Sequence, residues 1–311
     1  MDVDLSVDLG GLRLKNPVLV ASGTWGWGQE YAPLIDPNLL GGLVTKAVTL
    51  RPREGHRPPR TAETPCGLLN AIGLANIGVG RFIAEKLPFL ENLKTTVIVN
   101  VAGSTREEYL GVVRELEGRA GIDALEINIS CPNVRQGGMA FGTDPGVAHD
   151  LLAAIRDVTK RFLIAKLSPN VTDIAAVAQG AAAAGVDALS LVNTLVGMAV
   201  DVDTWRPRLS TVTGGLSGPA IRPVALAAVW KTARSVSLPI IGMGGIMSAG
   251  DAVEFFLAGA RAIQVGTANF VNPRTPLEII AGLKAYCSRR GIGSVGQLVG
   301  QLRSLDTEKA E

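Results

Sequence analysis

Short runs of β-branched and other apolar residues recur along the whole chain, and segments with helical periodicity separate most of them. The strand-like runs are 17–23, 41–48, 95–103, 121–130, 161–169, 185–194, 238–246 and 259–268. Helix-like stretches between them include 106–120, 145–160, 172–185 and 249–259, and the last two have Asp or Ser/Thr cap candidates at the start and glycine at the end. Eight such strands, each followed by a connection long enough for a helix, predict an α/β fold of the (β/α)8 TIM barrel type.

Three further segments modify this barrel. Residues 4–16 alternate around Gly10 and Gly11 and predict a hairpin that caps the bottom of the barrel. The connections after strands two and six, residues 49–94 and 195–237, are too long for a bare helix, and insertions of this kind usually build a site or its lid. Because no repeat or interdomain linker is evident, residues 1–311 are predicted to form one barrel domain.

Composition and charge exclude several classes of protein. The chain is 47% hydrophobic and 19% charged, which is enough apolar material for a large core. Its 30 basic and 28 acidic residues form no basic block, so a nucleic-acid or anionic-membrane surface is not expected. The N-terminus lacks the features of a secretory signal and no long apolar segment occurs, which predicts a cytoplasmic protein.

The cysteines do not suggest a disulfide framework or a metal centre. Cys66, Cys131 and Cys287 are an odd number at wide spacing, which fits reduced thiols. An iron–sulfur cluster usually needs four thiolates, so this chain is not expected to hold one by itself.

Polar residues at the predicted strand ends are the candidates for chemistry, because TIM barrels carry their active sites there. They are Ser22, Lys46, Asn100, Asn128, Cys131, Lys166, Asn193, Thr194, Gly244, Gly245, Gly266 and Thr267. Amide, ammonium and glycine groups dominate this set, and it contains no carboxylate. The two histidines, His56 and His149, fall in a predicted loop and a predicted helix, so no metal site is expected.

Glycines at the ends of strands seven and eight suggest a phosphate site. IIGMGGI and IQVGTA place unobstructed backbone N–H groups where such barrels bind phosphate, and Gly218 in 214–223 adds a third flexible loop. The alternative is that these glycines only form tight turns between strands and helices.

Two lysines lie inside otherwise apolar strands. Lys46 and Lys166 are either rim residues or groups that face a ligand, since an unpaired buried ammonium is costly and the sequence shows no evident acidic partner for Lys166. Their matching positions favour a ligand with delocalised negative charge. A phosphate together with a ring that becomes anionic describes reduced flavin mononucleotide.

Cys131 ends the run INISCPN at the mouth of strand four. Taken alone it could be a small buried hydrophobic residue, but Pro132 stops the strand and moves the thiol into a loop over the barrel. A nucleophilic cysteine normally needs a histidine, and neither histidine is plausibly placed from the sequence. A role as general base remains open beside the packing role.

The motifs at these positions resemble the class 1 dihydroorotate dehydrogenases, most closely the class 1B catalytic subunit. The resemblance covers essentially the whole chain and is most specific in INISCPNVRQGGMAFGT and GGLSGPAIRP. It implies oxidation of (S)-dihydroorotate to orotate in de novo pyrimidine synthesis, with one FMN per chain. The membrane-anchored class 2 enzymes are less similar, because they have serine where Cys131 stands.

The resemblance also implies site residues. Cofactor-binding positions would be Ser22, Lys46, Ala47, Asn100, Asn128, Lys166, Val192, Gly218, Gly244, Gly245, Gly266 and Thr267. Substrate-binding positions would be Lys46, Asn70, Ala71, Ile72, Gly73, Leu74, Asn128, Asn133, Asn193 and Thr194. Cys131 would be the catalytic base that removes the C5 proton while the C6 hydride passes to the flavin. An ordinary thiol titrates near 8.5, so the rate should rise with pH unless the site lowers that value.

The electron acceptor must be supplied from outside this chain, which has no GxGxxG nicotinamide motif. The class 1B resemblance implies a partner subunit that carries FAD and a [2Fe–2S] cluster and reduces NAD, on either side of a homodimer core. The alternatives are a class 1A-type enzyme that reduces fumarate, a dihydropyrimidine dehydrogenase-like domain, a non-redox phosphate-binding lyase or isomerase, and a non-catalytic barrel.

Overall fold

A closed barrel of eight parallel strands forms the centre of the molecule. The computed structural model describes residues 2–130, 135–136 and 139–303. The strand order around the barrel is β11-β12-β17-β18-β3-β4-β7-β8. The strands are β3 (Val18–Val20), β4 (Gly42–Val44), β7 (Thr96–Val101), β8 (Ala124–Asn128), β11 (Phe162–Lys166), β12 (Ala188–Leu191), β17 (Ile240–Met243) and β18 (Ala262–Val265). Each lies within one predicted run, so the TIM barrel prediction is confirmed.

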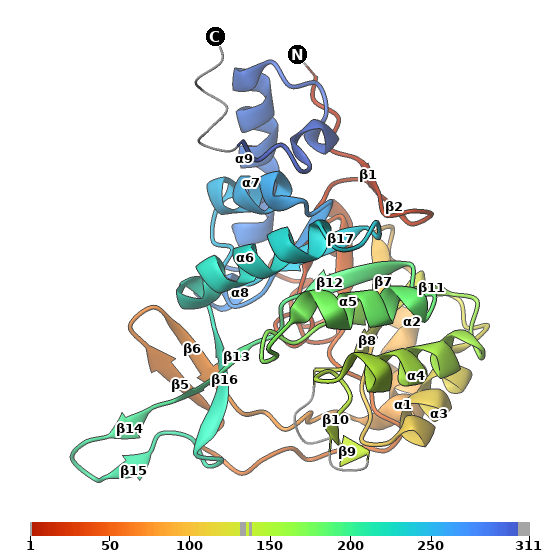
Figure 1. Ribbon diagram of the computed structural model, residues 1–311, viewed down its shortest axis with the longest axis vertical. Coiled ribbons are helices and arrows are strands. Elements are labelled where there is room, and N and C mark those ends of the chain that lie inside the picture. The colour runs from red at the N-terminus through yellow and green to blue at the C-terminus, as the bar shows by residue number, and fades with distance from the viewer. Residues whose placement is uncertain (1, 131–134, 137–138, 304–311) are drawn as a thin grey trace.

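Helices follow the strands and cover the outside of the barrel (Figure 1). They are α1 (Gly78–Glu85), α2 (Leu87–Leu90), α3 (Arg106–Leu116), α4 (Pro145–Arg156), α5 (Ile174–Ala183), α6 (Arg222–Ala233), α7 (Ala249–Ala258), α8 (Ala268–Val271) and α9 (Thr275–Arg290), with the short 3-10 helices η1 (Pro37–Leu39), η2 (Pro219–Ile221) and η3 (Val295–Leu298). The predicted caps are present: the side chain of Asp173 accepts from the Ala175 N–H, and Ser248 accepts from that of Asp251. α7 then ends at Gly259 in the left-handed conformation.

The N-terminal hairpin closes the lower end of the barrel. β1 (Val7–Asp8) pairs with β2 (Arg13–Leu14), and the Asp8 carboxylate accepts from the Gly10 and Gly11 N–H groups at 2.8 Å. Arg261 donates to the Asp8 carbonyl, and Gly10 packs against Pro239. Since Pro239 and Arg261 directly precede β17 and β18, the hairpin lies at the N-terminal ends of the strands, as predicted.

The two long insertions combine into one antiparallel sheet. β5 (Thr61–Thr64) and β6 (Gly67–Asn70) come from the first insertion, and β13 (Leu195–Met198) and β16 (Thr213–Ser217) come from the second. The strand order is β13-β16-β6-β5, so the sheet joins segments about 145 residues apart. Figure 1 shows it projecting from the barrel, with the hairpin of β14 (Val200–Asp201) and β15 (Arg206–Pro207) at its tip. A further short hairpin pairs β9 (Arg135–Gln136) with β10 (Met139–Ala140).

The apolar core is interrupted inside the barrel by a layer of polar residues. Asn100, Glu126, Ser190 and Gln264 are fully buried there, and Lys166 is 5% exposed. They lie on β7, β8, β12, β18 and β11, so five of the eight strands contribute one each. Among the described residues, no helix is both long and apolar enough to cross a membrane.

Candidate active site

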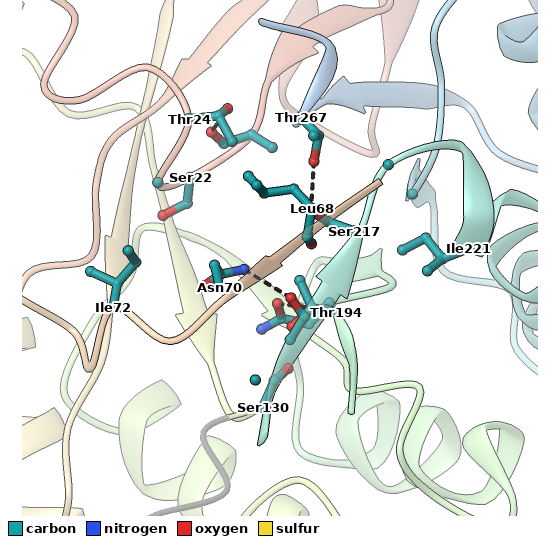
Figure 2. Close-up of a pocket in the computed structure, with 18 of the residues that line it drawn as sticks. Ser22, Thr24, Leu68, Asn70, Ile72, Ser130, Thr194, Ser217, Ile221 and Thr267 are labelled. Atoms are coloured by element: carbon teal, nitrogen blue, oxygen red, sulfur yellow. Dashed lines mark hydrogen bonds between the residues drawn. The ribbon is translucent and has the colours of Figure 1, made fainter. Parts of the chain in front are cut away.

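A cavity of about 770 Å³ opens at the C-terminal ends of the barrel strands. Residues that follow β3, β12, β17 and β18 line it from the barrel side, and the sheet of the two insertions forms the opposite wall. Figure 2 shows Ser22, Asn70, Thr194 and Thr267 around this space, contributed by segments far apart in the sequence.

Most of the predicted site residues lie on this one cavity. From the cofactor set these are Ser22, Lys46, Ala47, Asn128, Lys166, Val192, Gly218, Gly244, Gly245, Gly266 and Thr267; from the substrate set they are Lys46, Asn70, Ala71, Ile72, Gly73, Leu74, Asn128, Asn193 and Thr194. Asn100 is not among the lining residues, because its side chain is fully buried and its amide donates to Glu126 at 2.7 Å. Cys131 and Asn133 lie outside the described residues. The assigned roles stay predictions.

Glycines form one side of the cavity, and the structure explains why side chains are excluded. At Gly245, which has φ 76°, an added Cβ would lie 2.8 Å from both the Gly218 carbonyl oxygen and the Arg222 Cβ. At Gly218, with φ 91°, an added Cβ would lie 2.8 Å from the Gly67 Cα. Three chain segments therefore meet here through bare backbone. We call Gly218, Gly244, Gly245 and Gly266 the glycine wall.

Gly266 is a different case within the glycine wall. The nearest protein atom to a Cβ added there would be the Ala21 Cβ at 3.8 Å, so the protein itself leaves room for a side chain. A larger side chain would enter the cavity, which Gly266 lines. Thr267, next in sequence, donates its hydroxyl to Ser217 Oγ at 2.7 Å and ties the end of β18 to β16 (Figure 2).

Lys46 brings a positive charge to the cavity from the segment after β4. Its side chain is half-buried, and desolvation lowers the pKa of Lys46, an effect that the nearby Glu30 carboxylate opposes and the Arg60 guanidinium reinforces. Its backbone N–H is bonded to the Gly26 carbonyl at 2.8 Å, which anchors the segment.

Lys166 has an acidic partner, contrary to the expectation from the sequence. Its ammonium lies 3.6 Å from Oε1 of Glu126, which is fully buried inside the barrel. Glu126 lies inside β8, outside the set of strand-end residues that was predicted to contain no carboxylate. It stands two residues before Asn128 on β8, and since side chains two apart share a face of a strand, an inward-facing Asn128 already predicts an inward-facing Glu126. Glu126 was not among the predicted site residues, because these were taken from the strand ends.

Amide side chains form a second group of residues on the cavity. Asn128 Oδ1 accepts from the Ser130 N–H at 3.2 Å, and Asn193 Oδ1 accepts from the Thr194 N–H at 2.8 Å. The Asn193 amide donates to Asn128 Oδ1 at 3.5 Å, so the two amides support each other. Asn70 Nδ2 donates to the Gly215 carbonyl at 3.2 Å across the insertion sheet (Figure 2). We call Asn70, Asn128, Asn193 and Thr194 the amide wall.

His56 lines the cavity, which the sequence analysis did not anticipate. Its Nδ1 lies 3.2 Å from the Ala71 carbonyl, and its backbone N–H donates to the Ile72 carbonyl at 3.1 Å. These contacts hold the 70–74 segment, where Gly73 and Leu74 have φ 72° and 55°. No short sequence motif marks this contact, because the histidine meets its partner only in the folded loop.

Asn170 is a second lining residue that was missed. Its amide donates to the Thr194 carbonyl at 2.9 Å and its Oδ1 accepts from the Val196 N–H at 2.9 Å, which fastens the start of β13. Its position four residues after Lys166 in AKLSPN gives a sequence signal, since residues after a barrel strand face the mouth. Ser217 and Thr24 also line the cavity.

The site thus has two chemically different sides. The glycine wall offers backbone to an anion such as a phosphate, and the amide wall offers paired donors and acceptors to a planar ring. Lys46 and Lys166 add positive charge to the same cavity. This arrangement fits a ligand with a phosphate and an electron-rich ring, together with a small polar substrate.

Comparison with known proteins places this architecture in a family. A family model described as dihydroorotate dehydrogenase matches residues 4–286. A protein of Trichlorobacter lovleyi named dihydroorotate dehydrogenase B (NAD(+)), catalytic subunit, is 54% identical over 96% of this chain and 98% of its own length. A protein of Pelobacter propionicus with the same name is 54% identical over 97% of this chain and 99% of its own.

A solved structure supports the fold independently. The crystal structure of DHODH from Eimeria tenella in complex with ferulenol superimposes with a TM-score of 0.80 at 21% identity, over 96% of this chain and 88% of that one. At this identity the likeness concerns the fold. The sequence matches extend to almost every residue of the barrel and its insertions, and the chain belongs to the dihydroorotate dehydrogenase family.

Proposed function

We propose that this chain oxidises (S)-dihydroorotate to orotate in de novo pyrimidine synthesis and holds one FMN for this reaction. The observation that carries the proposal is the single cavity in which the glycine wall, two lysines and the amide wall come together. Membership of the dihydroorotate dehydrogenase family, which is generally FMN-dependent, supports the same reaction.

The residues present fit FMN. The glycine wall and Thr267 would hold the phosphate, because bare backbone there leaves N–H groups accessible and Gly266 leaves space beside it. Lys166 and Lys46 would lie near the electron-rich ring, and Ser22, Ala47 and Val192 would complete its surroundings. When bound, FMN would supply the hydride acceptor for C6 of dihydroorotate.

The amide wall would bind the substrate. Dihydroorotate presents an edge of alternating N–H and C=O groups, and each amide side chain can both donate and accept. Lys46 would meet the substrate carboxylate, and the 70–74 segment would close one side of the pocket. Several fixed groups would orient the substrate so that the C5 proton and the C6 hydride can be removed.

Cys131 is proposed as the base that takes the C5 proton, with Asn133 as a further substrate contact. This proposal rests on the sequence motif INISCPN, because both residues lie outside the described ones. The described end of β8 supports it indirectly: Tyr109 donates its hydroxyl to the Asn128 carbonyl at 2.7 Å, which fixes the strand three residues before the thiol.

The acceptor is proposed to be NAD, reached through a partner subunit that carries FAD and a [2Fe–2S] cluster. The relatives' printed name, an NAD-linked catalytic subunit, supports the existence of such a partner. We propose a homodimer of this chain as the core of the assembly, with one partner subunit on either side.

The test is to purify the chain alone and then together with its co-purifying partner. The chain alone should be yellow with FMN near one equivalent, and dihydroorotate should bleach it under anaerobic conditions while orotate appears. With the partner, NAD should support turnover. Colourless protein would favour the non-redox barrel, and turnover of the isolated chain with fumarate would favour the fumarate-linked alternative.

A further inference from the structure

A network of five polar side chains occupies the inside of the barrel next to the cavity. Its centre is Glu126, which is 0% exposed. Oε1 accepts from Asn100 Nδ2 at 2.7 Å, and Oε2 accepts from Ser190 Oγ and Gln264 Nε2 at 2.8 Å each. The Lys166 ammonium lies 3.6 Å from Oε1 and is the one member of the network that lines the cavity.

The neutral neighbours of Glu126 are oriented as donors toward its carboxyl group. All three neutral partners donate to it, and in doing so they leave Asn100 Oδ1 and Gln264 Oε1 without a hydrogen-bond partner among the described residues. Turning either amide round would place an oxygen against a carboxylate oxygen. A buried carboxylate stays charged when several donors and a cation surround it, and this one has both.

The distance to Lys166 has a specific consequence. At 3.6 Å the ammonium is held by charge attraction, yet the separation exceeds a good N–H···O hydrogen bond. The ammonium donors therefore remain available to a ligand. Within the described part of the chain, Glu126 is the only acidic side chain within 4 Å of this ammonium, and the other titratable side chains on the cavity are Lys46 and His56.

We propose that Glu126 is a positioning residue that fixes a protonated Lys166 at the floor of the cavity and limits how much of its positive charge reaches the ligand. The part of this inference that concerns bound FMN rests on the proposed function. Electron uptake adds negative charge to a bound flavin, so a partly neutralised lysine stabilises the reduced form less than a free ammonium does.

The first experiment needs no cofactor. Flavin-free protein is treated with acetic anhydride over a range of pH, and acetylation of the Lys166 and Lys46 amines is measured by peptide mass spectrometry. In Glu126→Gln the pH at which Lys166 becomes half reactive should fall by about one to three units, the usual effect of losing an opposite charge at this range. The Lys46 amine in the same sample is the control and should not move. An unmoved Lys166 would overturn the proposal.

The second experiment measures the reduction potential of bound FMN, at a pH below the Lys166 midpoint of every variant that retains Lys166. Glu126→Gln should shift the potential to more positive values, and Lys166→Gln should shift it to more negative ones. Because Glu126 is proposed to act through Lys166, the effect of Glu126→Gln should largely vanish in the Lys166→Gln background. An equal shift in both backgrounds would mean that the carboxylate does not act through Lys166.

Two matched variants guard this interpretation. Ser190→Ala removes a hydrogen bond from the same carboxylate without changing its charge. It should therefore shift the reduction potential of FMN less than Glu126→Gln does. If Glu126→Gln does not fold, Glu126→Asp keeps the charge but withdraws it from Lys166, and an intermediate positive shift is expected; no shift would count against the proposal. A wild-type chain that binds no FMN would refute the proposed function, whereas the acetylation result would still decide the role of Glu126.

Discussion

The glycine wall and the amide wall lie on one cavity but are built from different materials. At Gly218 and Gly245 the glycine wall is backbone against backbone, with the Gly218 carbonyl so close to Gly245 that no Cβ fits, whereas Gly266 leaves room for a side chain. The amide wall consists of side chains held by one or two hydrogen bonds each, such as that between Asn193 and the Thr194 N–H. Substitutions should therefore act sharply on the glycine wall and in a graded way on the amide wall.

The strongest way to break this comparison is Gly245→Val. A β-branched residue at φ 76° with a Cβ 2.8 Å from a carbonyl oxygen must displace the loop, so FMN should be lost while the barrel remains folded. Absorbance of the purified protein and its circular dichroism spectrum give both quantities. Gly80→Ala is the matched control, since nothing lies within 4 Å of a Cβ there. Stoichiometric FMN in Gly245→Val would mean that the phosphate lies elsewhere.

Cys131→Ala tests the proposed general base of the reaction. The variant should keep FMN and bind orotate, yet lose flavin reduction by dihydroorotate by about 10²–10⁴-fold, the usual worth of a positioned base. Stopped-flow bleaching from pH 6 to 10, around the ordinary thiol value, should show one ionisation in the wild type that is absent in the variant. Cys131→Ser should keep some activity, shifted to high pH.

Cys66→Ala is the control for Cys131, because Cys66 is an exposed free thiol and its described contact is a backbone one, with its carbonyl accepting from the Ala220 N–H. It should leave the rate unchanged. A wild-type rate in Cys131→Ala would leave that thiol with a packing role.

Lys166→Ala tests the ion pair with Glu126 that lies inside the barrel next to the cavity. It leaves Glu126 buried without its cation, which typically costs about 3–5 kcal/mol of stability. FMN should be lost or its reduction potential lowered. Urea unfolding of the flavin-free protein gives the free energy, and adding Glu126→Gln should restore most of it. If the single variant is as stable as wild type, the two side chains are not energetically coupled.

Asn193→Ala should have a smaller effect, which is limited to the binding of dihydroorotate. Loss of one amide contact, together with the hydrogen bond from Asn193 to Asn128, should raise KM for dihydroorotate by about 10- to 100-fold, which corresponds to roughly 1.4–2.8 kcal/mol. FMN content should not change. Asn92→Ala, at an exposed helix end, serves as the control. Loss of FMN in Asn193→Ala would show that the two walls are not separable.

Lys46→Met should give the smallest effect, a change in the thermal stability of the flavin-free protein. Burial lowers the pKa of Lys46, so the folded protein pays for keeping it charged at neutral pH, and the variant should melt slightly higher. As pH rises through the lowered folded value toward the ordinary one, wild-type folded protein loses that proton before the unfolded chain does, and its disadvantage shrinks. Thermal melts of flavin-free protein at pH 7 and near pH 10 measure this. A gap that widens with pH would contradict the sign.

The barrel could be predicted from the sequence because its signal is local. Each strand is a short β-branched run, and each of the eight predicted runs contains a barrel strand. Caps such as Asp173 and Ser248 are also local signals. The insertion sheet could not be predicted, because β6 and β16 are short and partly glycine, and the pairing that joins the two insertions is between strands far apart in the sequence.

The cavity residues at the ends of the barrel strands could be predicted from the sequence. The residues deeper inside the barrel could not. Ser22, Lys46, Asn128 and Thr267 follow the rule that strand ends face the mouth. Glu126 sits one inward position deeper, in a run otherwise read as apolar, and its partner Lys166 is 40 residues away, so neither a motif nor a spacing joins them. Asn100 belongs to the same buried network, and its amide faces Glu126.

The pairing of β6 with β16 sets an order of events during synthesis. Asn70 contacts Gly215, so one wall of the cavity waits for 145 further residues after its first half has been made. At roughly 5–20 residues per second, that delay is about 7–29 s, during which the edge of β6 that later pairs with β16 has no partner strand. A ribosome-bound chain that stops short of β16 should therefore leave the pocket unfinished, and cofactor capture becomes one of the last steps in the maturation of this barrel.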